Sequence, residues 1–250
     1  SSNQLFTVLS KEESNIFFNN QLEETESLNA IVYPYYYNGA GIAVADFNND
    51  DLVDVYFISN RRANRLYLNL GEMKFRDVTK EANAIGKFGF PGGVTVVDIN
   101  NDGLMDLAVM GRKEDGSSFT AIYQNKAGVL TDLGLTNIPL LNGDLKWADI
   151  NNDGWLDLLA VGQFSASRNR VQLFTNRKSF FEITEPRTIP ALRNSTIAFG
   201  DHDANGTIDL VIIGADSLSN ARSFLLNNDG KGNFAVDNSS QIIPSMCDGD

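Results

Sequence analysis

Short runs of apolar and β-branched residues recur along the chain, and each run is bounded by Asn, Asp or Gly. Ile42–Ala45 is followed by Val53–Ile58. Runs of this length and composition predict buried strands separated by tight turns. Two further strands are expected in the same stretch, over Arg65–Asn69 and Lys74–Thr79. The same order of four runs returns about every 50 residues, which is the spacing of a repeat protein.

A nine-residue polar motif lies between the first two runs of every repeat. Its copies occupy residues 46–54, 98–106, 149–157 and 201–209, so their starts are 52, 51 and 52 residues apart. Each copy has Asp at positions 1 and 9 and Asp or Asn at positions 3 and 5. Four strands in each period of about 50 residues predict the blades of a β-propeller. The expected fold class is therefore all-β, a β-propeller built of four-stranded blades.

The expected domain organisation is a single, incomplete propeller over residues 1–250, with about four blades and an N-terminal closing strand. Residues 5–10 mirror the predicted strand at 74–79, which makes them the fourth strand of a blade that closes the ring and protects sheet edges. Asp248 and Asp250 match positions 1 and 3 of a fifth motif. The expected segments are a lead-in at 1–41, repeats at 42–93, 94–144, 145–194 and 195–247, and the start of a fifth repeat at 248–250.

The motif has the donor pattern of a calcium loop. Side-chain oxygens at positions 1, 3, 5 and 9, a backbone carbonyl at position 7, and a glycine at position 6 suit a hard cation in a tight turn. Zinc would favour histidine or cysteine ligands, and magnesium requires a stricter octahedral geometry. One calcium ion per loop is expected. The predicted ligands are Asp46, Asn48, Asp50, Leu52, Asp54, Asp98, Asn100, Asp102, Leu104, Asp106, Asp149, Asn151, Asp153, Trp155, Asp157, Asp201, Asp203, Asn205, Thr207 and Asp209.

The motif is open to two other interpretations. Asx-rich turns without metal are common, but four copies with one pattern favour calcium over that interpretation. Helical calcium motifs open in a similar way, yet they continue into a helix and often need an acid at position 12. Here position 9 is followed by apolar runs such as Leu107–Met110, which favours strands.

The four loops differ at a few positions. Asp51 replaces glycine at position 6 of the first loop, where aspartate tolerates the left-handed conformation at a cost, so this site is expected to be the weakest. In the fourth loop Asp203 and Asn205 exchange the usual Asn and Asp of positions 3 and 5. His202, at position 2 of that loop, is interpreted as an outward-facing surface residue. Trp147 and Trp155 flank the third loop and are expected to pack in the core.

The composition narrows the classes of function. The chain has 32 acidic and 20 basic residues, a net charge of −12, which argues against nucleic acid as a partner. At positions 1, 3, 5 and 9 the four loops carry twelve acids, as many as the whole net charge. One histidine and one cysteine exclude multi-histidine metal sites and an intrachain disulfide. No apolar run is long enough to cross a bilayer, and the first residues do not form a signal peptide.

The loops resemble the FG-GAP/VCBS repeats of integrin α-subunit propellers and of bacterial surface proteins. The stretches Asn64–Asn69, Phe75–Thr79 and Gly92–Val94 further resemble the bacterial VCBS and ASPIC/UnbV-like branch. The resemblance implies a propeller, commonly seven-bladed, with calcium between the first two strands of each blade. It also implies an exported or lipid-anchored protein, for example a bacterial surface lipoprotein. Asp51 departs from the family pattern.

Strand alternation places the loops between second and third strands, and those between blades, on the face opposite the calcium loops. Aromatic and basic residues gather in these segments and suit recognition of a protein or a glycan, with a preference for an anionic one. Solvated arginines and aromatics packed between blades are the competing interpretation. The candidate contacts are Tyr35, Tyr36, Tyr37, Arg61, Arg62, Phe88, Phe90, Arg112 and Arg168.

The function expected from these features is a non-enzymatic, calcium-stabilised propeller of the cell surface or extracellular space that binds protein or carbohydrate. Calcium outside cells is millimolar, which suits calcium sites of the weak affinity found in extracellular modules. An enzyme acting on polysaccharide is one alternative, although the sequence shows no spacing that marks a catalytic pair. A structural subunit of a larger secreted assembly is the other.

Overall fold

A computed structural model gives the fold of the chain. It describes residues 6–26, 29, 31, 41–60, 62–86, 90–113, 117–135, 141–165, 168–178 and 180–237. The described residues are almost entirely strands and turns, with one short helix, α1 (Lys11–Ser14). None of the described helices has the length and hydropathy that a bilayer-spanning helix requires.

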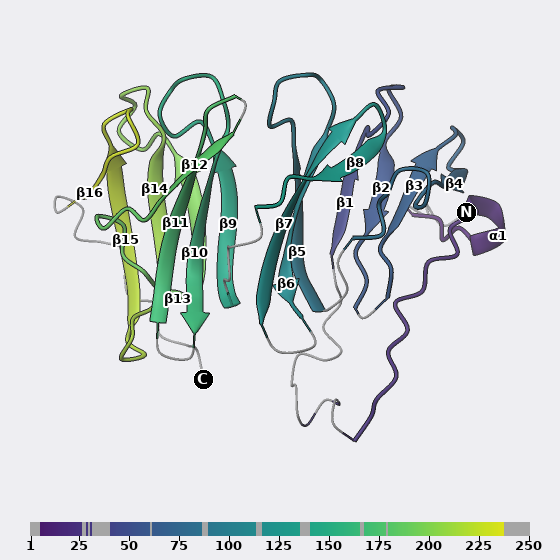
Figure 1. Cartoon of the computed structure of the whole chain (residues 1–250), viewed down its shortest axis with the longest axis horizontal. Coiled ribbons are helices and arrows are strands. Elements are labelled where there is room, and N and C mark those ends of the chain that lie inside the picture. Colours follow the sequence, from purple (N-terminus) through teal and green to yellow (C-terminus); the bar gives the residue numbers. More distant parts are fainter. Residues whose placement is uncertain are drawn as a thin grey trace, which may run out of the picture. The chain divides into compact units, whose positions relative to one another are not determined.

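The strands form four sheets, and each sheet contains four antiparallel strands that follow one another along the chain (Figure 1). This meander is the topology of a propeller blade, so the predicted fold class is confirmed. The first sheet consists of β1 (Ile42–Ala45), β2 (Asp54–Phe57), β3 (Arg65–Asn69) and β4 (Phe75–Asp77). The second consists of β5 (Phe90–Val97), β6 (Asp106–Arg112), β7 (Ser118–Lys126) and β8 (Val129–Asp132). The third consists of β9 (Leu141–Ala148), β10 (Asp157–Ser165), β11 (Arg168–Asn176) and β12 (Phe181–Thr184). The fourth consists of β13 (Arg193–Gly200), β14 (Asp209–Ala215), β15 (Ala221–Asn228) and β16 (Phe234–Val236).

The sheets group into two compact units. Unit 1 contains residues 1–98, 102–117 and 121–135, which include the first sheet and most of the second. Unit 2 contains residues 99–101, 118–120 and 136–250, which include the third and fourth sheets. Each unit therefore holds about two blades.

Apolar side chains fill the space between blades within each unit. In unit 1 Tyr56 is fully buried, and its hydroxyl donates to the carbonyl of Ala84 at 3.1 Å and accepts from Asn64 Nδ2 at 2.8 Å. In unit 2 the core joins residues of the third and fourth sheets, among them Ile150, Leu159, Leu210 and Ile212, which are all less than 1% exposed. Burial of these side chains supplies the main driving force for packing one blade on the next.

The predicted N-terminal strand at residues 5–10 is expected to complete a blade that is not among the four sheets described, so its role in closing the ring stays a prediction. Residues 6–10 form no strand, and Phe6 and Val8 are 85% and 92% exposed. Ser10 instead caps α1, in a capping box in which Ser10 and Glu13 exchange hydrogen bonds. A strand needs a partner for its backbone groups, and among the described residues no strand pairs with this segment. Residues 248–250, the expected start of a fifth repeat, lie outside the described part.

Several strands extend further than their apolar pattern indicates. β5, β9 and β13 begin at Phe90, Leu141 and Arg193, ahead of the expected repeat starts at 94, 145 and 195. All three include an irregularity of register near their beginnings, for example between Pro91 and Gly93. Such a bulge shifts which side chains face the core, so the alternation of apolar and polar residues is lost there.

Candidate metal centres

The polar loops lie where the sequence places them, between the first and second strand of every sheet. Position 9 of each loop is the first residue of the second strand: Asp54 in β2, Asp106 in β6, Asp157 in β10 and Asp209 in β14. The rest of each loop forms a series of bends. Regular strands on both sides therefore fix the two ends of each loop.

The aspartate at position 1 organises the loop around its carboxylate. In all four copies one carboxylate oxygen accepts the backbone N–H of position 5 and the other accepts the N–H of position 6. The nitrogen–oxygen distances are 3.1 and 2.8 Å for Asp46, 3.2 and 2.8 Å for Asp98, 3.0 and 2.9 Å for Asp149, and 3.0 and 2.9 Å for Asp201. These bonds turn the chain back on itself and hold the first acid inside the turn.

The turn requires left-handed backbone at positions 4 and 6. Glycine takes position 6 in the last three loops, with φ of 84°, 83° and 85° for Gly103, Gly154 and Gly206. In the first loop Asp51 adopts φ 65°, as its sequence position implies. A side chain in this region costs energy that glycine avoids, so the first loop folds under more backbone strain.

In the first, third and fourth loops, positions 3 and 5 pair with each other through an amide and a carboxylate. Asn48 Nδ2 donates to Asp50 Oδ2 at 2.9 Å, and Asn151 makes the same bond to Asp153 at 3.0 Å. In the fourth loop the direction reverses, since Asn205 Nδ2 donates to Asp203 Oδ2 at 2.9 Å. The exchange of Asp and Asn in this loop therefore preserves both the contact and the number of carboxylates.

The aspartate at position 9 is buried in every loop, with an exposure of 0 to 1%. One oxygen of Asp157 accepts the N–H of Ile150 at 3.1 Å, and the other accepts the N–H of Asn176 at 2.8 Å. Asp54 and Asp209 each accept the corresponding two bonds. The carboxylate thus links its loop to the end of the third strand of the same blade.

Burial makes the negative charge at position 9 costly. The pKa of Asp157 is raised to about 6, chiefly by burial and also by repulsion from Asp153 and Asp149, although the hydrogen bonds from Asn176 and Ile150 oppose the shift. The pKa of Asp54 is raised in the same way, first by burial and then by Asp50 and Asp46. The acids at positions 1 and 5 thus repel the charge at position 9 in these two loops, and a divalent cation would offset that repulsion.

The donors present fit calcium. Each loop offers side-chain oxygens at positions 1, 3, 5 and 9 and the carbonyl of position 7, in a turn held open by its own hydrogen bonds. These are the hard oxygen ligands that calcium prefers. When bound, the ion would supply positive charge to the loop, and its ligands would be the residues named for each loop above.

One set of structural residues was not identified from the sequence: the asparagines that lie at or next to the end of each third strand. Asn228 Nδ2 donates to Ile208 O at 2.9 Å in its own blade and to Ile150 O at 2.7 Å in the preceding blade. Asn125 likewise donates to Met105 O at 3.1 Å and to Phe47 O at 2.8 Å. Asn69 donates to Val53 O at 3.0 Å. Every repeat has an Asn at this place, and this recurrence in the sequence is the signal that identifies the set.

The fourth loop has a further candidate metal-binding side chain, that of His202. His202 Nε2 lies 3.8 Å from Asp209 Oδ2 and 2.7 Å from Asn227 Oδ1. Within the described residues, donor atoms of His202, Asp203 and Asp209 all fall within 4.8 Å of one another, and the acids of the other loops form no such group. The hydrogen bond that His202 Nε2 donates to Asn227 Oδ1, followed by nearby acids, raises the pKa of His202. His202 is exposed, as expected, but its side chain points to the loop acids rather than only to solvent.

The candidate ligand face is described only in part. Tyr35, Tyr36, Tyr37, Arg61 and Phe88 lie outside the described residues, as do the side chains of Phe90 and Arg112. Arg62 pairs with Glu23 at 3.5 Å, and Arg168 pairs with Glu185 at 3.8 Å. Both arginines are about half exposed, so solvated ion pairs account for their positions.

The two tryptophans differ in surroundings. The ring of Trp147 lies 6.2 Å from that of Phe181, between centroids. The Trp155 ring lies 5.3 Å from Lys178 Nζ in a cation–π contact, beside the third loop. Both are partly exposed, so neither is a fully buried core residue.

Taken together, meander sheets and acidic loops at the start of each second strand define a repeat protein of propeller blades. Residues 46–109 and 149–212 match the profile of the FG-GAP-like repeat and together cover just over half of the 250 residues. The chain therefore belongs to the FG-GAP-like repeat family, as its motifs indicate.

Two individual proteins are similar to this chain. Cartilage acidic protein 1 of Xenopus tropicalis is 24% identical over 218 residues, which cover 84% of this chain and 33% of that protein. The chain thus spans about one third of the length of this curated relative. The crystal structure of a thermostable family-43 glycoside hydrolase covers 81% of this chain and 74% of its own, with a TM-score of 0.46 and 10% identity.

Proposed function

We propose that each of the four loops binds one calcium ion and that the ions stabilise the blades. The observation that carries this proposal is the repeated loop geometry: the same carboxylate at position 1 holds the same two amides, and the same buried acid stands at position 9. A turn that needed only hydrogen bonds would not require three acids within nine residues. A cation relieves their repulsion in the folded chain only, so its binding adds stability.

We further propose that the protein acts outside cells as a binding module for a protein or glycan rather than as an enzyme. Loops of this kind suit compartments with millimolar calcium. The acidity of the chain agrees with this setting, and the similar Xenopus protein is named as an acidic protein of cartilage. Loops on a rigid blade scaffold are the usual place for recognition.

Thermal unfolding in calcium and in chelator tests the metal proposal. At free calcium about 100 times the dissociation constant, one site adds roughly 2.7 kcal/mol. In a chain of this size that equals a rise in Tm of about 5 to 10 °C for each site. We expect chelation to lower Tm, and Asp149→Ala to remove part of the response. Asp229→Ala, outside the metal loops, is the matched control and should retain the full response. Equal Tm values in calcium and chelator would reject the proposal.

A further inference from the structure

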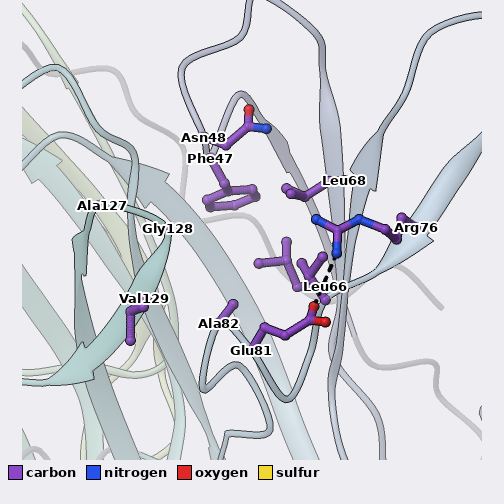
Figure 2. A pocket seen from close by; sticks show the side chains of 11 residues that line it. Phe47, Asn48, Leu66, Leu68, Arg76, Glu81, Ala82, Ala127, Gly128 and Val129 are labelled. Carbon is purple, nitrogen blue, oxygen red and sulfur yellow. Dashed lines mark hydrogen bonds and ion pairs between the residues drawn. The ribbon is translucent and has the colours of Figure 1, made fainter.

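Unit 1 contains a pocket of about 440 Å³ beside the first metal loop. Its apolar wall consists of Phe47, Leu66, Leu68, Val78, Ala82 and Val129. Figure 2 shows Phe47, Leu66 and Leu68 on the first blade and Val129 across from them, on the hairpin of β7 and β8. The pocket is thus formed by two neighbouring blades of one unit, and it is large enough for a side chain or a small ligand.

The pocket exists because the turn between β7 and β8 is short. That turn consists of Ala127 and Gly128, with φ of 51° and 85°. The corresponding turn of the fourth sheet, between β15 and β16, has the five residues 229–233. A Cβ on Gly232 in that turn would lie 3.7 Å from Ile150, which occupies the loop position of Phe47. In unit 2 a longer turn therefore covers the place that remains open in unit 1.

The mouth of the pocket carries one donor group and one acceptor group. Arg76 Nη1 lies 3.4 Å from Glu81 Oε2, and the two side chains are 54% and 67% exposed. Figure 2 shows this pair beside Leu66, at the edge of the apolar wall. An exposed pair at this distance contributes little to stability, so both groups are available to a ligand without a large loss.

These features select a peptide over other ligands. A backbone amide can accept from Arg76 and donate to Glu81 at once, while its side chain occupies the apolar pocket. A free acid would be repelled by Glu81 and by the acids of the adjacent metal loop, and a free cation would be repelled by Arg76. A purely apolar ligand would leave the paired charges partly desolvated and without new hydrogen bonds.

We propose that the pocket binds an apolar side chain of a partner protein, leucine- or phenylalanine-sized, and that Arg76 and Glu81 hold the backbone of that residue. This gives a partner chemistry to the proposed binding role and rests on that role, but it does not rest on the metal.

Fluorine NMR titration of the folded chain tests the inference with three probes. N-acetyl-para-fluoro-L-phenylalaninamide carries both the ring and the backbone amides. Para-fluorotoluene carries only the ring, and para-fluorophenylacetate carries a ring with an acid. Two net hydrogen bonds correspond to about a tenfold gain in affinity. We expect the blocked amino acid to bind about tenfold more tightly than either other probe.

Variants locate the site and separate its parts. Replacing Ala127 and Gly128 with Asp-Gly-Lys-Gly-Asn, the sequence of residues 229–233, should fill the pocket and abolish binding of all probes. Arg76→Ala should remove the preference for the blocked amino acid but retain binding of fluorotoluene. Arg177→Ala is the matched control, because Arg177 forms a similar pair with Glu182 in unit 2. Arg177→Ala should leave the binding of all three probes unchanged.

Melting curves of every variant in calcium and chelator show whether the fold and the metal response are intact, so a failure of this inference is distinguishable from a failure of the metal proposal. The inference is overturned if the acid or fluorotoluene binds as tightly as the blocked amino acid. It is also overturned if no probe binds to the folded protein, or if a folded turn variant binds all probes unchanged.

Discussion

Two aspartates at opposite edges of the blades in unit 2 show contrasting electrostatics. Asp157 is the first residue of β10 and the last of the third polar loop, is 1% exposed, and has its pKa raised to about 6, chiefly by burial. Asp216 follows β14 at the other edge of its sheet, and its pKa is lowered to about 2, chiefly by the side chain of Asn220. Arg222 also donates to Asp216, at 3.0 Å.

The contrast indicates where a cation is needed. Asp216 has its negative charge stabilised by donors of the protein itself, including one arginine. Asp157 receives two backbone N–H groups, but burial and the neighbouring acids outweigh them. The protein therefore supplies enough counter-charge of its own at Asp216, whereas at Asp157 burial and the neighbouring acids outweigh the donors that are present. Substitutions at the two edges test whether this difference affects stability and calcium binding.

The largest expected effect is that of Asp157→Ala compared with Asp216→Ala. Removing the Asp157 carboxylate leaves the N–H groups of Ile150 and Asn176 without their acceptor and removes a proposed calcium ligand. We expect a loss of about 3 to 5 kcal/mol in the free energy of unfolding in calcium. Asp216→Ala should cause a much smaller loss. Urea denaturation of both variants measures the difference, and equal losses would remove the distinction between the two edges.

A smaller effect is expected for the asparagines behind the buried acids. Asn228→Ala leaves the carbonyls of Ile150 and Ile208 without donors, which should cost about 2 to 3 kcal/mol. Asn69→Ala removes a single described carbonyl contact, to Val53, and should cost about 1 kcal/mol. The same denaturation experiment checks both. If the two substitutions cost the same, contact with the preceding blade contributes nothing measurable.

Exchange of residues at position 6 sharpens the comparison between loops. Gly154→Asp should destabilise the third loop by about 1 kcal/mol, because φ near 83° is unfavourable for a side chain. Asp51→Gly should stabilise the first loop by less than that, at a φ of 65°. Calcium titration of the two variants should show weaker and tighter binding respectively. Changes of the opposite sign would contradict the strain argument.

The smallest effect is the acid response of Asp216. Its pKa in the folded state, about 2, lies below the value of about 3.9 for an unfolded aspartate. The stability that its charge contributes is therefore fully present above the unfolded pKa and is lost as the pH falls toward the folded pKa. Asp216→Asn should make stability less dependent on acid pH. Unfolding curves of wild type and variant across that range test this, and parallel curves would contradict it.

The sequence predicts the periodic part of the molecule well. Position 1 acids, left-handed position 6 and the strands on both sides of each loop are local features, so residues such as Asp149 and Gly154 reveal them. The partner of Asn228 is Ile150, 78 residues away, and only the fold brings them together. The pocket beside Phe47 depends on the length of a distant turn in the next blade. No local sequence pattern encodes the Asn228–Ile150 contact or the pocket.

The N-terminal prediction shows the limit of matching one segment to another. Phe6 and Leu9 align with Phe75 and Val78, and the alignment predicts a strand. Phe75 and Val78 are buried in the first blade, where β4 pairs with β3. Within the described chain, Phe6 has no such partner strand and remains 85% exposed. Similar side chains give similar structure only where similar neighbours are present.

Equilibrium dialysis against calcium of known activity tests the central claim most directly, because it counts bound ions. At millimolar free calcium we expect about four ions per chain, one per loop, and about three after Asp149→Ala. A chain that is folded by its near-ultraviolet circular dichroism and binds no calcium at that concentration would contradict the account.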